Sequence, residues 1–212
     1  MTHAEKLILI MLSEIYEHLG IGGADHINAR FVRSAIDSDQ TWALSRKYPF
    51  IFGGRTQTPD VVSEVRDILD MWSFIEEAHE GFSAEEKKRV KTEARPYGDA
   101  RFVGFDRHTD ILHIEVAKIL IEGLDHFSRF KGRDLDSHVP VLNAYLRMYQ
   151  VFEPIRKTLV GRGLTATEMI DIFKAPDAGD RGNILGCAAK SGELTGSKRA
   201  SAETFSPSHV SS

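Results

Sequence analysis

Apolar residues recur at spacings of three and four along most of the chain as far as residue 174, and no stretch alternates apolar and polar residues as a strand would. The widest apolar face belongs to residues 110–127, where apolar side chains would cover more than half of a helical cylinder. A face this wide needs partners on several sides. We therefore predict an all-α fold, a single domain of about seven or eight helices around a central helix at 110–127.

Capping signals mark where the other helices begin. Capping boxes, in which a hydroxyl residue and a Glu three positions later satisfy each other's backbone N–H groups, occur at Thr2, Ser83 and Thr165. Thr58-Pro59 is a further start signal, because threonine caps helices and proline fits the first helical position. The predicted helices span residues 2–19, 25–36, 40–47, 58–81, 83–94 and 164–174, with another that starts at Ser137 or Pro140 and is ended or kinked by Pro154.

Two of these helices carry regular apolar stripes. On the helix at 58–81 the stripe alternates spacings of four and three, which is typical of a seam between packed helices. Such a seam lies inside the chain or between subunits, and we favour the interior. Its members are Val61, Val65, Ile68, Trp72, Ile75 and His79. On the first helix the stripe consists of Leu7, Ile8, Met11, Leu12, Ile15 and Leu19.

The irregular stretches also make specific predictions. In the loop at 48–57, Phe50, Ile51 and Phe52 are interpreted as anchors tucked into the core. Gly104 stands where the backbone passes closely or takes a positive φ. Asp106 is interpreted as the N-cap of the central helix, and Asp110 as a charge that favours its first turn.

Composition changes after residue 174. Residues 1–174 have the apolar content for one substantial core, whereas 175–212 are rich in Gly, Ser and Ala and are predicted to be a disordered tail. The single cysteine, Cys187, excludes an internal disulfide, and no apolar run is long enough for a membrane span. We expect a soluble cytoplasmic protein that does not insert into a membrane.

The sequence contains none of the glycine-rich phosphate loops, nucleophile elbows or His-Glu-x-x-His zinc helices that signal catalysis. Asp106, Asp110 and His113 are spaced to share one side of a helix, but a structural role for them is favoured over proton transfer. The histidines are not spaced as metal ligands, so neither a metal nor a cofactor is predicted.

Nucleic acid is also disfavoured as a partner. The formal net charge is −4 with acids and bases interspersed, which gives no global field for phosphates. The segment 40–77 could be imagined as a helix-turn-helix, but its link at 48–57 is too long, and Asp60, Glu64 and Asp67 would face the phosphates.

Phe102-Val103-Gly104-Phe105-Asp106 resembles the Phe-Leu-Gly-Phe-Asp-like segment that precedes a long helix in the YfbU family of small bacterial proteins. The similarity extends in the same order over roughly residues 5–173, and ends at the tail. Matching segments are Leu7-Ile8-Leu9, Glu122-Gly123 with His126-Phe127, Tyr145-Leu146-Arg147-Met148, and Leu164-Thr165 to Phe173. The resemblance implies a multihelical fold and no catalytic residue. Asp106, His126 and Arg147 match its motifs and are polar, which makes them candidate binding residues.

Three functions remain open at this point. The leading hypothesis is a non-enzymatic module that forms a homo-oligomer and binds another protein. The alternatives are a hydrolase built from carboxylates and histidines, and a nucleic-acid-linked regulator. A pocket that unites Asp106, His126 and Arg147 would favour the enzyme, whereas caps and ion pairs at these positions would favour the module.

Overall fold

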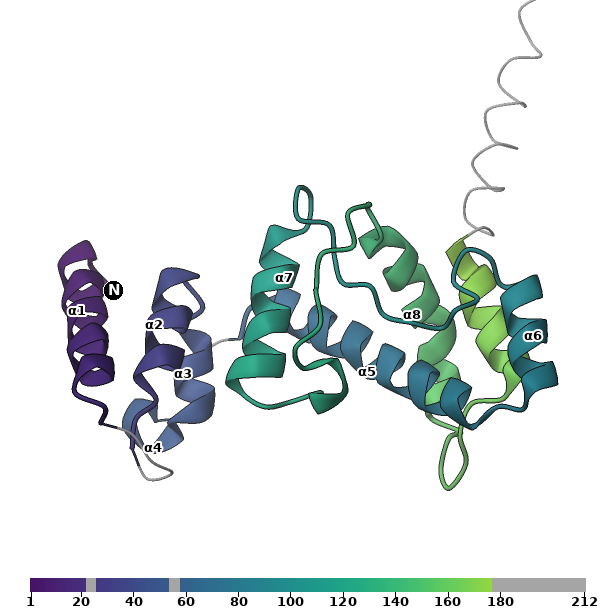
Figure 1. Ribbon diagram of the computed structural model, residues 1–212, viewed down its shortest axis with the longest axis horizontal. Coiled ribbons are helices and arrows are strands. Elements are labelled where there is room, and N and C mark those ends of the chain that lie inside the picture. The colour runs from purple at the N-terminus through teal and green to yellow at the C-terminus, as the bar shows by residue number, and fades with distance from the viewer. Residues whose placement is uncertain (22–25, 54–57, 177–212) are drawn as a thin grey trace, which may run out of the picture. The chain divides into compact units, whose positions relative to one another are not determined.

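The computed structural model describes residues 1–21, 26–53 and 58–176, which form helices joined by irregular connections (Figure 1). No strand occurs among these residues, so the all-α prediction is confirmed for them. The tail was predicted for 175–212, but residues 175 and 176 belong to the last described helix. The rest of the predicted tail, including Cys187, lies outside the described residues. The helices are α1 (His3–His18), α2 (Ala29–Asp37), α3 (Trp42–Lys47), α4 (Pro49–Phe52), α5 (Asp60–Gly81), α6 (Ala84–Glu93), α7 (Ile111–Lys118), the π-helical turn η1 (Ile119–Gly123), the 3-10 turn η2 (Ser128–Phe130), α8 (Leu142–Arg156) and a helix at 166–176.

The longest helix, α5, runs through the core with α7 and α8 packed against it. Its seam residues Val65, Ile68, Trp72 and Ile75 are all buried within this one chain. The seam is therefore internal, as the sequence favoured. By contrast, α6 buries only Val90, which agrees with its charged sequence.

The segment that leads into α7 passes through the aromatic centre of the core. The Phe102 ring lies 6.0 Å from that of Trp72 and 5.9 Å from that of Tyr145, and the Phe105 and Tyr145 rings are 6.0 Å apart. The Phe105 N–H donates to the Leu135 carbonyl at 2.9 Å, which holds the connection after η2 against this segment. Phe105 and Leu135, which are far apart in the sequence, are thus joined through their backbones.

The helix predicted for 110–127 is shorter than expected at both ends. Its helical turns begin at Ile111 and stop at Gly123, where a Cβ atom would stand 2.4 Å from the Phe31 ring. Asp110, not Asp106, occupies the N-cap position, and its side chain makes no capping hydrogen bond. The N-cap assignment of Asp106 was wrong, because its carboxylate already accepts from the His108 N–H in a tight turn.

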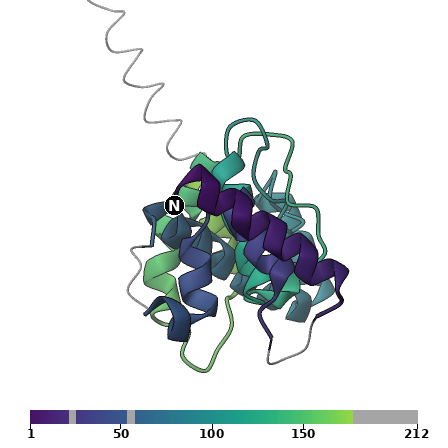
Figure 2. The same cartoon turned by 90° about the vertical axis from the view of Figure 1, so that its left-hand side faces the viewer.

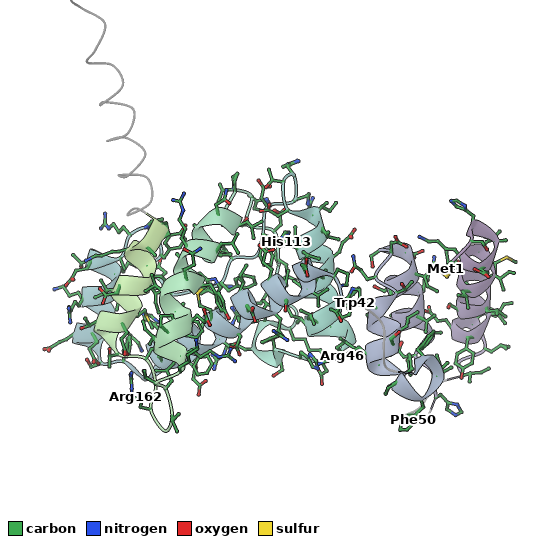
Figure 3. The ribbon with its side chains drawn as sticks, turned by 180° about the vertical axis from the view of Figure 1, so that it is seen from behind. Met1, Trp42, Arg46, Phe50, His113 and Arg162 are labelled. Carbon is green, nitrogen blue, oxygen red and sulfur yellow. The ribbon has the colours of Figure 1, made fainter. Side chains whose placement is uncertain are left out.

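The predicted core anchors in 48–57 are also wrong. Residues 49–52 form the single turn of α4, and Phe50 is 102% exposed, with Ile51 and Phe52 exposed beside it. Tyr48 anchors this stretch instead, because its ring packs on the core and its hydroxyl accepts from the Asn28 N–H at 2.9 Å. Figure 3 shows Phe50 at the outer edge of α4.

Other helix ends differ from the predictions by a few residues. α5 starts at Asp60 with Pro59 at the N-cap and no side-chain cap, so Thr58 does not serve as one. α8 continues through Pro154 to Arg156, because a proline in the last turn removes only one hydrogen bond from a helix that is about to end. α2 starts at Ala29, where the Asn28 side chain accepts from the Phe31 N–H.

All three predicted capping boxes are present. The third joins Thr165 and Glu168 at the start of the helix at 166–176, and Arg162 adds two hydrogen bonds of 2.8 Å to the same carboxylate. The Arg162 guanidinium, followed by the hydrogen bonds from Thr165, lowers the pKa of Glu168 from 4.5 to about 2. These hydrogen bonds stabilise Glu168 in its ionised form, so their effect is lost when the carboxylate is protonated.

We expect Glu168→Gln to reduce stability at neutral pH by about 1 kcal/mol, since it removes the charge that pairs with Arg162, whereas a glutamine can still complete the capping box. The pKa is lower in the folded state, so the contribution is complete above pH 4.5 and is lost as the pH falls towards 2. Denaturation between pH 7 and pH 3 should therefore show a flatter profile for the variant. Glu77→Gln, an exposed carboxylate on α5 that caps no helix, is the control; a parallel profile for Glu168→Gln would contradict the assignment.

Among the described helices, none combines the length and the apolar content that crossing a lipid bilayer requires.

Candidate functional site

Asp106 is buried and engaged in local structure. Its Oδ1 accepts from the His108 N–H at 2.9 Å, and its carbonyl accepts from the Asp110 N–H at 2.8 Å. Both bonds fix the turn that leads from the core segment into α7. This arrangement fixes the backbone of the turn.

His113 lies in the first turn of α7, where its N–H donates to the Asp110 carbonyl at 2.9 Å, whereas Asp106 and Asp110 both precede the helix. Its Nε2 lies 3.7 Å from the Glu64 carboxylate on α5, and its ring is 5.5 Å from that of Phe105. The imidazole, labelled in Figure 3, is thus a partly buried residue between α5 and α7.

Arg147 lies on the exposed side of α8, where its Nη1 donates to the Pro176 carbonyl at 3.0 Å. This bond holds the last described turn of the chain against α8. His126 lines a groove whose described lining includes neither Arg147 nor Asp106. The three candidates from the sequence are therefore not brought together in that groove.

His126 occupies a different setting, in the irregular segment between η1 and η2. The residues on either side of it, Asp125 and Phe127, have φ angles of 57° and 56°. A left-handed conformation is unusual for a bulky residue such as phenylalanine. Its unfavourable free energy must be offset by contacts with the surrounding residues. Here the His126 N–H donates to the Leu120 carbonyl at 2.9 Å, and Lys131 binds the Asp125 carboxylate at 3.0 Å.

The His126 side chain lines a groove of about 490 Å³ between α3, the start of α5 and η1. Arg46 comes from the end of α3, and Arg66 comes from the second turn of α5. Figure 3 labels Arg46 and Trp42 on α3. The described lining consists of Trp42, Ser45, Arg46, Pro49, Thr58, Val62, Ser63, Arg66, Leu120, Leu124, His126 and Phe127.

Lys47 connects the two sides of this groove. Its ammonium donates to the Gly123 carbonyl at the end of η1 and lies 4.2 Å from the centre of the Phe31 ring. Burial lowers the pKa of Lys47, against the opposing effect of the Asp125 charge. The contact joins α3 to η1 and so fixes Arg46 relative to His126.

Family membership follows from the whole of the described chain and not from this groove alone. The model of the YfbU domain matches residues 1–175. The chain belongs to the YfbU family. The match ends one residue before the end of the last described helix, so every helix described above lies essentially within the YfbU domain.

A second surface of the YfbU domain is apolar. One face of α1 packs on α2, but the stripe seen in the sequence lies on the other face and is 53–64% exposed. Figure 2 views the protein from this side, with α1 in front of the other described helices. Together with exposed neighbours it forms what we call the N-terminal apolar surface: Leu7, Ile8, Met11, Leu12, Ile15, Leu19, Ile21, Ile27, Phe50, Ile51 and Phe52.

A groove of about 260 Å³ makes this surface continuous. Leu12 lines it from α1, Ile27 from the residues before α2, and Ile51 and Phe52 from α4. Its described lining contains no charged residue. The exposed stripe and the groove are therefore parts of one apolar area.

The deepest charged pair in the YfbU domain is structural. The buried Glu76 carboxylate accepts two bonds from Arg133, at 2.7 and 2.8 Å, and one from the Phe102 N–H at 2.9 Å. This pairing raises the pKa of Arg133. The pair fixes the core segment, because the Glu76 carboxylate joins the Arg133 side chain to the Phe102 backbone. In the described residues, no three His, Cys, Asp or Glu side chains are grouped to hold a metal ion.

Sequence reasoning selected His126 but missed Arg46 and Arg66. No local motif could have found them, because the groove forms only when α3, α5 and η1 pack together. The exposure of the α1 stripe was missed for a related reason. A periodic pattern shows that a helix has an apolar face, but it does not show what covers that face.

Proposed function

We propose that this YfbU domain is a non-enzymatic module that self-associates through the N-terminal apolar surface. The observation that carries the proposal is α1, which is apolar on the face that packs on α2 and again on the opposite face. A helix that is apolar on both sides is normally buried on both sides. In the described chain, only one of these faces is covered.

The spacing of the exposed stripe supports a second helix as its partner. Ile8, Leu12, Ile15 and Leu19 follow one another at intervals of four, three and four, which is the pattern of a helix-packing seam. In an antiparallel pair of α1 helices, Ile8 would stand opposite Leu19 and Leu12 opposite Ile15. The stripe is thus complementary to itself, as a two-fold symmetric dimer requires.

The available area is of the right size for such a dimer. A fully exposed aliphatic side chain presents roughly 100 Å² of apolar surface, so eleven side chains about half exposed leave on the order of 600 Å² in water. Standard interfaces bury about 800 Å² per partner. The absence of charge from the stripe favours a second copy over a partner recognised through ion pairs.

The test is the oligomeric state of an Ile15→Glu variant, measured by light scattering coupled to size exclusion. We expect the parent to be a dimer, and the variant to dissociate at least about a hundredfold more readily, because each interface would bury two unpaired carboxylates. Ile15 is exposed in the single chain, so circular dichroism should show an unchanged helix content.

Ile111→Glu provides the matched control. Ile111 is also an exposed isoleucine on a helix, 58% exposed against 53% for Ile15, but it belongs to α7. It should leave the dimer intact. A parent protein that remains monomeric at high concentration would refute self-association, and a dimer that survives Ile15→Glu would place the interface elsewhere. If the protein is a monomer and a different protein co-purifies with it through this surface, self-association is refuted and that protein is the partner.

A further inference from the structure

The groove around His126 is lined by basic residues that have no role in self-association through α1. Its described lining contains two arginines and a histidine and no acidic residue, in a chain whose formal net charge is −4. A groove lined by charges of one sign concentrates ligands of the opposite sign, so this groove favours anions.

We infer that this groove binds a small organic phosphate of nucleotide size, with the phosphate on Arg46 and Arg66 and the attached organic group on the apolar floor. A guanidinium binds a phosphate through two parallel hydrogen bonds, so two arginines supply a strong and oriented site. Hydroxyl groups of Ser63 and Thr58 stand in the same lining as further donors.

The two arginines differ in how readily they can meet a ligand. Arg46 is exposed and has no ion pair within the described residues, which leaves its guanidinium available. Arg66 lies 3.2 Å from the Asp67 carboxylate and 3.4 Å from the Ser63 hydroxyl. That ion pair is on the surface, where such pairs contribute little, so a phosphate can compete for it.

The rest of the groove suits an uncharged ring. Val62 and Leu120 are buried at its floor, and Trp42 contributes its ring while its indole N–H is satisfied by Gln40 at 2.6 Å. Phe127 adds a second aromatic ring. The volume of about 490 Å³ falls within the roughly 300–1,000 Å³ usual for small-molecule sites.

The backbone at His126 supports a binding role independently of the charges. The π-helical turn of η1 and the left-handed residues Asp125 and Phe127 bring Leu124, His126 and Phe127 into the same groove. π-turns and strained residues occur frequently at functional sites, where the strain positions a side chain. The side chains so positioned line the same groove as the two arginines.

The experiment is calorimetric titration of the full-length protein with adenosine 5′-monophosphate as the probe. Adenosine and inorganic phosphate, titrated separately, report on the two halves of the ligand. We expect the monophosphate to bind at least about tenfold more tightly than either half, and Arg46→Ala and Arg66→Ala each to weaken it by about tenfold or more.

Arg30→Ala is the matched control, because Arg30 is an exposed arginine on α2 outside this groove. It should bind the probe as the parent does, and circular dichroism should be the same for all three variants. If adenosine binds as tightly as adenosine 5′-monophosphate, the groove does not recognise the phosphate. If inorganic phosphate binds as tightly as the monophosphate, the groove does not recognise the organic group. No binding of either the monophosphate or phenyl phosphate at millimolar concentration would overturn the site. Loss of dimerisation through Ile15→Glu should leave this binding unchanged, so the two proposals fail separately.

Discussion

Gly104→Val is expected to destabilise the protein by about 3–5 kcal/mol, a large part of the 5–15 kcal/mol that holds a typical domain folded. Two separate costs add at this position. Gly104 has a φ of +93°, which a branched side chain adopts only under strain. In addition, any Cβ atom would stand 2.0 Å from the Leu135 carbonyl oxygen and 2.6 Å from its Cα.

The backbone around Gly104 cannot move away cheaply. The neighbouring Phe105 is hydrogen-bonded to Leu135 through its N–H and to Ser137 through its carbonyl, and its ring lies in the aromatic centre of the core. A shift that relieved the contact would break these bonds and displace Phe105. Even Gly104→Ala should therefore lose most of the stability that Gly104→Val loses.

Gly132→Ala separates the two costs. Gly132 has a similar φ of +73°, but no heavy atom lies within 4 Å of where its Cβ would be. It should lose only the conformational part, about 1 kcal/mol. Urea denaturation of the parent, Gly104→Ala and Gly132→Ala measures the difference directly. Alanine variants of equal stability would show that Leu135 does not constrain Gly104.

The accuracy of the sequence predictions depends on how local the responsible interactions are. The capping boxes at Thr2, Ser83 and Thr165 involve side chains and backbone within four residues, so the sequence alone determines them. The sequence around Gly104 predicted either a close backbone approach or a positive φ at this residue. The structure has both.

Predictions failed where a distant part of the chain decides the outcome. The helix expected at 110–127 ends at Gly123, where the Phe31 ring packs against it, although the two residues are far apart in sequence. Phe50 was expected in the core, but Tyr48 takes the inward position and leaves Phe50 in water. The candidate groove is the same kind of case, since Arg46, Arg66 and His126 meet only through tertiary packing.

The seam on α5 leads to the second large effect, the replacement of Ile68 by lysine. Ile68 is 1% exposed and belongs to the apolar core between α5 and its neighbours. An ammonium group placed there would be removed from water without a partner, which costs several kcal/mol. We expect the variant to be largely unfolded at room temperature or to lose at least about 4 kcal/mol of stability.

The same variant also distinguishes an internal seam from an intersubunit one. Had the seam joined two subunits, Ile68→Lys would yield a folded monomer, because the lysine would face solvent once the subunits parted. Burial within the single chain leads instead to loss of folding. Glu77→Lys, an exposed position on the same helix, controls for the added positive charge and should keep the parent's helix content. Circular dichroism and thermal unfolding give the answer, and a native, cooperatively unfolding Ile68→Lys protein would contradict the position of α5 in the core.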